Sequence, residues 1–277
     1  MTLAESLNAA ARAIGAADAL LITAGAGMGV DSGMPDFRGP EGFWRAYPPY
    51  QQLGLRFEEL ANPFWFANDP ALAWGFYGHR LNLYRATMPH RGFQILKKWG
   101  ERARLGFGVF TSNVDGHFQK AGFPAERIHE VHGSIHHLQC QAQCGTGIFS
   151  AEGMEVEINP DTLRAREPWP QCPACGGLAR PNVLMFGDWD WDSRRSNAQE
   201  AKLENWLRSL GTARLVVVEC GAGLAIPTVR RFGEQVARSH RGALVRINIR
   251  EPEGADVGIP LGALEALQRI DAILAAV

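Results

Sequence analysis

The sequence LLITAGAGMGVDSGMPDFRG occupies residues 20–39 and joins an apolar run to a cluster of glycines. The run at residues 19–23 has the length and composition of a buried strand. Gly25, Gly27 and Gly29 follow it, and glycine lets the backbone approach another group closely. A strand that leads through glycines into a helix start presents free N–H groups and the positive end of a dipole. The stretch therefore predicts an α/β fold that holds a dinucleotide at the end of its first strand.

The loop after the glycines distinguishes this chain from an ordinary Rossmann protein. Val30 stands where the usual fingerprint places its third glycine. Residues 35–38, Pro-Asp-Phe-Arg, come too soon for a crossover helix, so we expect a loop that carries an acid, an aromatic ring and a base. Residues 32–39 closely match the end of the sirtuin signature GAGxSxxSGIPDFRG, and through them the chain resembles the sirtuin family.

The composition is that of an ordinary soluble protein with a substantial core. The chain has 277 residues, of which 46% are hydrophobic and 21% are charged. Its net charge of −1 gives no electrostatic reason to expect a nucleic-acid partner. No apolar run reaches the roughly 18 residues that a membrane span needs, and the N-terminus lacks a basic-then-apolar signal pattern. We therefore expect a cytoplasmic protein with no membrane partner.

Most of the chain alternates between helical and strand patterns, which is typical of a doubly wound parallel sheet. Residues 40–90 differ, because they are rich in aromatic residues and turn formers and predict short helices packed as a lid beside the nucleotide. Outside the lid, the expected helices are residues 3–14, 91–100, 228–238 and 262–276, and the expected strands are residues 106–111, 215–220 and 243–249.

A polar motif follows the strand expected at residues 106–111. The sequence TSNVDG begins at Thr111, at the carboxyl end of that strand, where open α/β sheets bind ligands. It resembles the sirtuin pattern TQNIDxLHxxAG, with Ser112 in place of Gln. The resemblance implies that Asn113 and Asp115 hold the nicotinamide carboxamide and the adjoining ribose. Without the resemblance, the pattern Asn-x-Asp-Gly is also typical of an ordinary turn.

A histidine-rich segment comes next in the chain. The sequence IHEVHGS at residues 128–134 resembles the family's ELHGS, and His132 is the histidine that precedes its Gly-Ser. The resemblance implies that His132 is the catalytic base. His129, His136 and His137 lie nearby but lack the Gly-Ser that follows the family's base.

Four of the five cysteines form two close pairs, Cys140 with Cys144 and Cys172 with Cys175. Two such pairs can give a closed four-thiolate tetrahedron, in which no position is left for water, so the zinc ion would be structural. Redox-active dithiols are the alternative, but two pairs within one short insertion argue against them. Cys220 lies in an apolar run and is expected to be a buried packing residue.

Tyr77 and Arg80 are candidates for an acyl-group contact. They are three residues apart, so they share a face if this segment is a helix. A surface arginine beside a packed tyrosine is the simpler interpretation. In sirtuins, a Tyr-x-x-Arg pair at this place characterises members that accept acidic acyl groups. The resemblance therefore implies that the two side chains bind the distal carboxylate of a succinyl or malonyl group.

Residues 180–188 are candidates for contacts with a peptide. Their sequence RPNVLMFGD resembles the family's RPxVVWFGE, whose strand edge pairs with the substrate backbone. The resemblance implies that Val183, Phe186 and Gly187 contact an acyl-lysine protein substrate by strand addition. A buried strand that leaves the zinc insertion is the alternative.

The chain departs from the family where hydroxyl groups would contact NAD. Gly29 replaces a serine, and Gly-Ala-Gly-Leu at residues 221–224 replaces GTSL. Backbone N–H groups can still bind phosphate, so we expect altered affinity and not lost binding, at about 1 kcal/mol per missing hydrogen bond before compensation. Asn248 matches the family's adenosine-ribose asparagine.

The resemblance implies one sirtuin-type catalytic domain over residues 1–277. Its Rossmann-like part would comprise about residues 1–40, 91–135 and 187–277, with a helical lid at about 41–90 and a zinc-ribbon insertion at about 136–186. The cofactor-binding residues that it implies are Gly25, Ala26, Gly27, Asp36, Phe37, Arg38, Ser112, Asn113, Asp115, Gly221, Ala222, Gly223 and Asn248.

The activity that the resemblance implies is NAD-dependent removal of acetyl or succinyl groups from protein lysines, with NAD as cosubstrate and one structural zinc. Nicotinamide would leave, the acyl oxygen would attack C1′ of the ribose, and His132 would take a proton from a ribose hydroxyl, so that the acyl group ends on ADP-ribose. An NAD glycohydrolase or mono-ADP-ribosyltransferase could use the same activated ribose, and the departures at Gly29, Ser112, Ala222 and Gly223 keep that alternative open. A dehydrogenase and a non-enzymatic NAD sensor are weaker alternatives.

Overall fold

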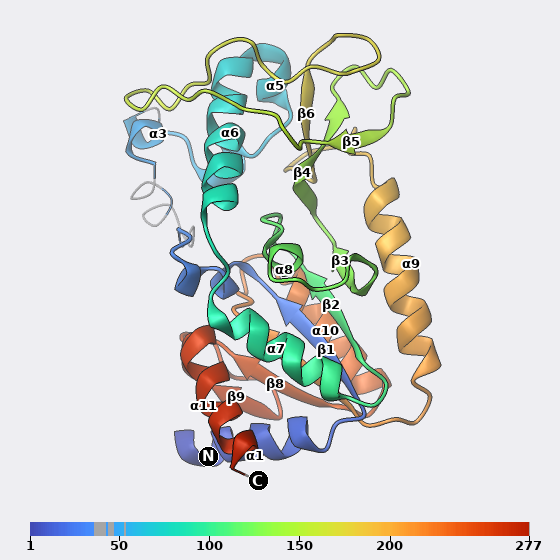
Figure 1. The fold of residues 1–277 in the computed structure, drawn as a ribbon. Helices are drawn as coiled ribbons and strands as arrows, with labels where there is room; N and C mark the ends of the chain where they lie inside the picture. Colours follow the sequence, from blue (N-terminus) through green and yellow to red (C-terminus); the bar gives the residue numbers. More distant parts are fainter. Residues whose placement is uncertain (36–42, 44–46, 53, 277) are drawn as a thin grey trace.

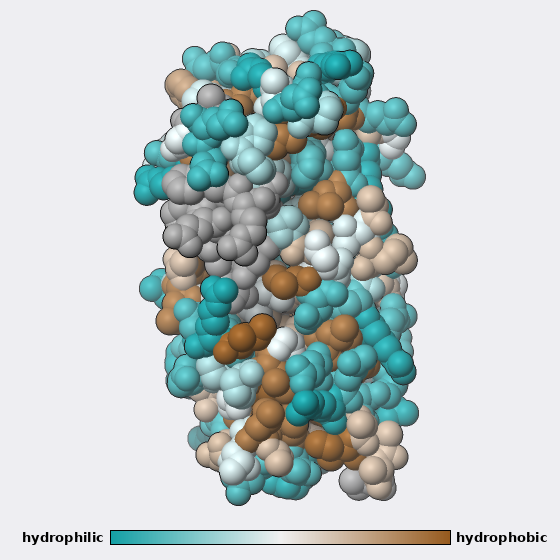
Figure 2. Space-filling view, turned by 90° about the vertical axis from the view of Figure 1, so that its left-hand side faces the viewer, coloured by the Kyte–Doolittle hydropathy of each residue, from teal (hydrophilic) through white to brown (hydrophobic). Residues whose placement is uncertain are grey.

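The computed structural model describes residues 1–35, 43, 47–52 and 54–276. A larger part, at the bottom of Figure 1, contains a parallel sheet and both chain termini, and a smaller part lies above it. In Figure 2, hydrophobic residues gather in the middle and lower half of the visible face, whereas the upper end is mainly hydrophilic. In the described part of the chain, none of the helices combines the length and the apolar character that a membrane span requires.

The six strands of the large sheet run parallel in the order β3-β2-β1-β7-β8-β9. They are β1 (Ala19–Ala24), β2 (Phe107–Thr111), β3 (Ile128–Glu130), β7 (Leu215–Cys220), β8 (Ala243–Ile247) and β9 (Val257–Ile259). The chain winds outward from β1 to β3, returns to the centre at β7 and winds outward again. The strand order therefore reverses between β1 and β7, and ligands of such sheets bind outside the carboxyl ends at this point.

Helices cover both faces of this sheet (Figure 1). The helices α1 (Leu3–Gly15), α7 (Arg91–Arg102) and α11 (Ala263–Ala275) pack on one face, and α9 (Arg194–Ser209) and α10 (Thr228–Ser239) pack on the other. Alternate residues of β1 point to opposite faces, with Leu20 and Ile22 in the first core and Ala19 and Leu21 in the second. The doubly wound fold predicted from the sequence is confirmed.

The smaller part combines a second sheet with the helices of the lid segment. Its antiparallel strands β4 (Gly133–Cys140), β5 (Ile148–Ser150) and β6 (Ala179–Val183) have the order β5-β4-β6. The helices are α3 (Pro48–Gln52), α4 (Phe57–Leu60), α5 (Phe64–Asn68) and α6 (Pro70–Ala86). Trp74 of α6 joins the two layers, because its indole N–H donates to the carbonyl of Ala179 at 3.0 Å. Short helical turns, η1 (Ala26–Met28), η2 (Val30–Ser32), α8 (His117–Lys120) and η3 (Ala125–Arg127), complete the described elements.

The helices and strands predicted outside the lid are all present, with ends shifted by at most two residues. The prediction was incomplete at α9, at β3, β5 and β9, and at the eight-residue strand β4. Helix α9 buries few residues and so has a weak apolar stripe, and β3, β5 and β9 have three residues each. The expectation of short helices throughout the lid was wrong for α6. This helix has 17 residues and is buried on most of its surface, so no single apolar face marks it in the sequence.

A buried ion network joins the neighbouring strands β7 and β8 to helix α10. Arg246 of β8 lies opposite Glu219 of β7, and both side chains are fully buried. The guanidinium donates from Nε to Glu219 Oε1 at 2.5 Å and from Nη2 to Glu234 Oε1 of α10 at 2.8 Å. A third donor, Nη1, bonds to the carbonyl of Glu253 at 2.6 Å. Arg246 therefore donates hydrogen bonds to two carboxylates and to a backbone carbonyl of the loop that follows β8.

We predict that Arg246→Met lowers the free energy of unfolding by about 3–5 kcal/mol, because Glu219 is then left buried without a counter-charge. Urea unfolding followed by circular dichroism measures the change. Arg238→Met is the matched control, since it removes a 71% exposed arginine that reaches Glu234 at 3.9 Å, and it should cost less than about 1 kcal/mol. Equal effects of the two substitutions would contradict the prediction.

Candidate active site

Two glycine turns meet at the point where the strand order reverses. Gly25 follows β1 and Gly221 follows β7, and the N–H of Gly27 donates to the carbonyl of Gly221 at 3.0 Å. A Cβ on Gly25 would lie 2.8 Å from the Cα of Ala222. A Cβ on Gly221, where φ is +64°, would lie 2.4 Å from the carbonyl carbon of Gly27. The turns therefore pack backbone against backbone, and side chains are excluded at both places.

The same turns leave backbone donors for a ligand. Among the described residues, the N–H groups of Ala26, Ala222 and Gly223 donate to no protein acceptor. Such groups at the carboxyl edge of a parallel sheet bind phosphate oxygens without any side-chain hydroxyl. The residues present thus fit the pyrophosphate of a dinucleotide, although the family's hydroxyl groups are absent at Gly29, Ala222 and Gly223.

The loop after β2 docks against the first glycine turn. Asn113 donates from Nδ2 to the carbonyl of Gly25 at 3.0 Å, and Ser112 donates its N–H to Ala24 at 3.2 Å. Asp115 is 9% exposed, and its Oδ1 accepts the N–H of His117 at 2.9 Å. The structure therefore brings Ser112, Asn113 and Gly25 together, with Asp115 two residues farther along the loop.

His132 lies in the short link between β3 and β4, where the two parts of the protein join. Its carbonyl accepts the N–H of Leu184 at 2.9 Å, and its side chain hydrogen-bonds to the backbone of Ser112. Burial lowers the pKa of His132, and the bond to Ser112 offsets only part of that shift. The imidazole is therefore neutral near pH 7 and can accept a proton.

His129 has the character of a packing residue. It is 2% exposed, and its Nε2 lies 3.1 Å from the hydroxyl of Ser196 on helix α9. Burial, with a further contribution from nearby His132, lowers the pKa of His129 to about 4. A histidine in this state is neutral at all physiological pH values and is tied to the helix behind the sheet.

Tyr77 and Arg80 are both buried on helix α6, at 1% and 7% exposure. The interpretation of Arg80 as a surface residue is therefore wrong. Its Nε donates to the hydroxyl of Tyr84 at 2.8 Å, and its guanidinium carbon lies 5.1 Å from the ring centre of Phe76 and 5.9 Å from that of Tyr77. Burial disfavours the charge of Arg80, but the neighbouring tyrosine hydroxyls outweigh it and hold the pKa of Arg80 above its usual value. The structure thus places a permanent cation within aromatic walls.

Tyr84 was not predicted as a site residue. Its position four residues after Arg80 on a helix is the signal that could have identified it.

The proposed peptide segment is partly strand and partly turn. Strand β6 ends at Val183, which pairs with Gly133, and it is an edge strand of its sheet. Phe186 is 39% exposed and donates its N–H to Ala61 at 2.9 Å, and Gly187 lies in a turn with φ of +67°. The motif at residues 180–188 therefore begins as a strand and continues as a turn after Val183.

A buried ion pair that the sequence analysis missed holds the turn. Arg180 Nη1 and Nη2 bond to the two carboxylate oxygens of Asp188 at 2.7 and 2.8 Å. Asp188 also accepts the N–H groups of Met185 and Asp190. No local pattern in the sequence signals this pair.

Asn248, which follows β8, is buried and bonds to backbone groups on two sides. It is 2% exposed, its Nδ2 donates to the carbonyl of Ala222 at 2.7 Å, and its Oδ1 accepts the N–H groups of Arg250 and Glu251. In this structure Asn248 therefore supports the second glycine turn. The predicted cofactor residues Asp36, Phe37 and Arg38 lie outside the described residues.

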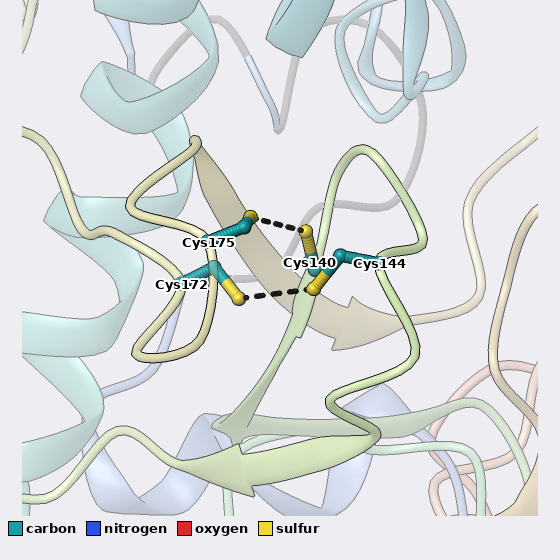
Figure 3. Close-up of side chains that lie close together, drawn as sticks. All are labelled: Cys140, Cys144, Cys172 and Cys175. Atoms are coloured by element: carbon teal, nitrogen blue, oxygen red, sulfur yellow. Dashed lines mark hydrogen bonds between the residues drawn. The ribbon is translucent and has the colours of Figure 1, made fainter.

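The four paired cysteines converge from the end of β4 with the loop after it and from the loop before β6 (Figure 3). Their sulfur atoms all lie within 4.8 Å of one another, with Cys140 3.6 Å from Cys175 and Cys144 3.5 Å from Cys172. Zn–S bonds of about 2.3 Å in a tetrahedron require sulfur atoms about 3.8 Å apart. The cluster therefore fits one zinc ion, and all four positions are filled by thiolates. Cys220 is fully buried in β7, as expected.

Comparisons with known proteins decide the family. The model of the Sir2 family matches residues 25–219, which is well over half of the chain. The chain belongs to the Sir2 family. An NAD-dependent protein deacylase 2 of Pyrobaculum aerophilum is 32% identical over 90% of this chain and 88% of its own length. The NAD-dependent protein deacylase sirtuin-5, mitochondrial, of Danio rerio is 33% identical over 79% of this chain and 72% of its own length.

Solved Sir2 structures show the same fold. A mutant Sir2 homologue in complex with ADP-ribose is 27% identical, with a TM-score of 0.71 over 97% of this chain and 96% of its own. A Sir2 homologue in complex with NAD is 26% identical, with a TM-score of 0.69 over 97% of this chain and 94% of its own. The Rossmann-like sheet with a small cysteine-bearing part is therefore the Sir2 fold.

We predict that this Sir2 protein contains one zinc ion per chain and that Cys172→Ser loses it, because three thiolates no longer close the tetrahedron. Metal analysis of the purified protein gives the stoichiometry, and thermal unfolding should show a clearly lower midpoint for the variant. Cys220→Ala is the matched control, since Cys220 lies in the sheet and should keep the metal content unchanged. Zinc retained at full occupancy in Cys172→Ser would contradict the assignment.

Proposed function

We propose that this Sir2 protein is an NAD-dependent protein-lysine deacylase, which releases nicotinamide and transfers the acyl group to ADP-ribose. One observation carries the proposal. The side chain of His132 bonds to Ser112 in the loop beside the glycine turns, and its carbonyl bonds to Leu184 beside the proposed peptide segment. A neutral base therefore stands between the two proposed binding sites. The names of the curated relatives support the same reaction.

The glycine turns form the proposed site for the phosphates of NAD. Backbone N–H groups of residues 25–27 and 221–223 would hold the pyrophosphate, and Asn113 and Asp115 would hold the nicotinamide end. Asn248 would act through Ala222, whose carbonyl it bonds. Asp36, Phe37 and Arg38 remain predictions. Bound NAD supplies an electrophilic ribose carbon when nicotinamide departs.

His132 is the proposed general base, because its lowered pKa leaves Nδ1 or Nε2 free to take a proton from a ribose hydroxyl. An NAD glycohydrolase would not need a base at this hydroxyl, and the placement of His132 therefore favours acyl transfer. The proposed substrates are acyl-lysine proteins. The cytoplasmic location and the division into large part, lid and insertion also stay predictions, and the Danio rerio relative is named as mitochondrial.

We predict that His132→Ala lowers kcat for deacylation by about 10²–10⁴-fold while NAD binding remains measurable, because the side chain serves proton transfer. His129→Ala is the control and should keep most of the activity. In the wild type, kcat/KM should fall on the acid side with a pKa below 6.5, since burial lowers the pKa of His132 and protonation removes the base. If His129→Ala is inactive and His132→Ala is active, the assignment is wrong.

The acyl group is the finer part of the proposal. Arg80 and Tyr77 lie side by side on α6, and Phe76 and Tyr84 complete an apolar wall around the guanidinium. A carboxylate that enters this environment forms charge-assisted hydrogen bonds of high strength, because little water competes for either charge. An acetyl group offers no such partner. The arrangement therefore supports a preference for succinyl or malonyl over acetyl, as the resemblance also implies.

We predict that Arg80→Met lowers kcat/KM for a succinyl-lysine peptide by one to two powers of ten, because charge-assisted bonds of about 1.5–3 kcal/mol each are lost. The kcat/KM for the matching acetyl-lysine peptide should stay level or rise. Arg85→Met removes the same charge from the next turn of α6 and is the control. It should leave the succinyl-to-acetyl ratio unchanged. A wild type that prefers acetyl, or an Arg80→Met variant that loses both activities equally, would remove the proposed acyl contact.

A further inference from the structure

The loop between β6 and α9 carries a tryptophan that is almost fully exposed. Residues 188–193 read Asp-Trp-Asp-Trp-Asp-Ser, and the Trp189 side chain is 96% exposed. Leu184 and Phe186, which precede it, are 38% and 39% exposed. Large apolar side chains that gather at the surface mark places where another molecule binds. Trp189 extends the proposed peptide segment by a few residues.

A cavity of about 280 Å³ opens beside this tryptophan. Its lining includes Trp189, Asp190 and Trp191. We call this cavity the tryptophan pocket. The cavity is also lined by Gln143 and Thr146 of the first cysteine loop and by Arg194, whose charge is paired with Asp192. The cavity thus lies between the loop that leaves β6 and the loop that carries the first cysteine pair, and it shares no lining residue with the glycine turns.

Buried amides hold the pocket in shape. Gln139 is 3% exposed, its Nε2 donates to the carbonyl of Asp190 at 2.8 Å, and its Oε1 accepts the N–H of Asp192 at 3.1 Å. Asn182 is 1% exposed and donates from Nδ2 to the carbonyl of Asp192 at 2.8 Å. The Arg180–Asp188 ion pair fixes the beginning of the same loop. The pocket is therefore preorganised, and little ordering is needed when a ligand binds.

The chemistry of the pocket suits a cation on an apolar stem. Among the described residues, no hydrogen-bond donor or ion-pair partner contacts the carboxylate of Asp190, whereas Asp192 is already bonded to Arg194. Indole faces attract lysine and arginine side chains, and their methylene stems pack on the same rings.

We propose that the tryptophan pocket binds a lysine or arginine side chain of the protein substrate, close in sequence to the acyl-lysine. The proposal rests on the proposed function, which places the substrate backbone along residues 183–187. Asp190 lies four positions after Phe186 in the sequence. An extended chain advances at most about 3.3–3.6 Å per residue. The basic residue therefore lies within about four positions of the acyl-lysine.

Paired peptides test the proposal. Each pair carries succinyl-lysine and differs at one position, two to four residues before or after it, where one peptide has arginine and the other has the isosteric neutral residue citrulline. For one of these positions, arginine should lower KM about 5- to 20-fold with little change in kcat. Trp189→Ala and Asp190→Asn should each remove most of this preference and leave kcat/KM for the citrulline peptide unchanged. Phe64→Ala, which removes another exposed ring, is the control and should keep the preference.

A binding measurement separates this proposal from the proposed function. Fluorescence anisotropy of labelled arginine and citrulline peptides reports affinity without turnover. An arginine preference in binding that disappears in Trp189→Ala supports the pocket even if no peptide is deacylated, and in that case the proposed function fails alone. The proposed role of the pocket is overturned if the wild type deacylates both peptides without preferring arginine. It is also overturned if Trp189→Ala and Asp190→Asn both keep the preference. A dimer of the wild type that Trp189→Ala dissociates, seen by light scattering, also overturns it, because a second copy would then cover Trp189.

Discussion

The contact between the turns after β1 and β7 is the constraint on which the site depends. Gly25 and Gly221 bring two backbones so close that a Cβ at either position would overlap a main-chain atom. This contact lies where the strand order reverses, and the loops after β2 and β8 are then bonded to it through Asn113 and Asn248. Loops that follow four parallel strands therefore meet at this place, and the backbone donors come from two of them. Backbone N–H groups of this kind can bind phosphate without side-chain hydroxyl groups.

The smaller part of the protein depends on a different kind of interaction. Its sheet has three short strands, and the residues around it are held by buried polar groups and by the cysteine cluster. The Arg180–Asp188 pair and the Gln139 amide bind the chain that leaves β6 before it reaches α9. These polar contacts and the cysteine cluster add to the apolar core that the lid helices form with the second sheet. The same bonds fix the course of the segment after β6.

Much of the fold and part of the site could be predicted from the sequence. Periodic segments such as residues 215–220 and 228–238 appear as a strand and a helix, because apolar spacing is a local property. The two cysteine pairs also lie close together, as predicted. The burial and the contacts of Tyr77 and Arg80 could not be predicted, because they involve neighbours that periodicity does not reveal. Phe57 lies on another helix, and Tyr84 shares the buried side of α6 with Arg80.

By itself, the sequence determined the strand–glycine turn at residues 20–29, the order of the main helices and strands, the metal-binding pairs and the histidine that precedes Gly-Ser. Each of these features depends on residues that are close together in the sequence. The tertiary structure alone decided that Asn248 supports Ala222, that Arg80 is buried, and that Gln139 closes the loop at Asp192, 53 residues away. These outcomes require hydrogen bonds and burial between distant segments, and the free energy of such contacts has no local signature in the sequence.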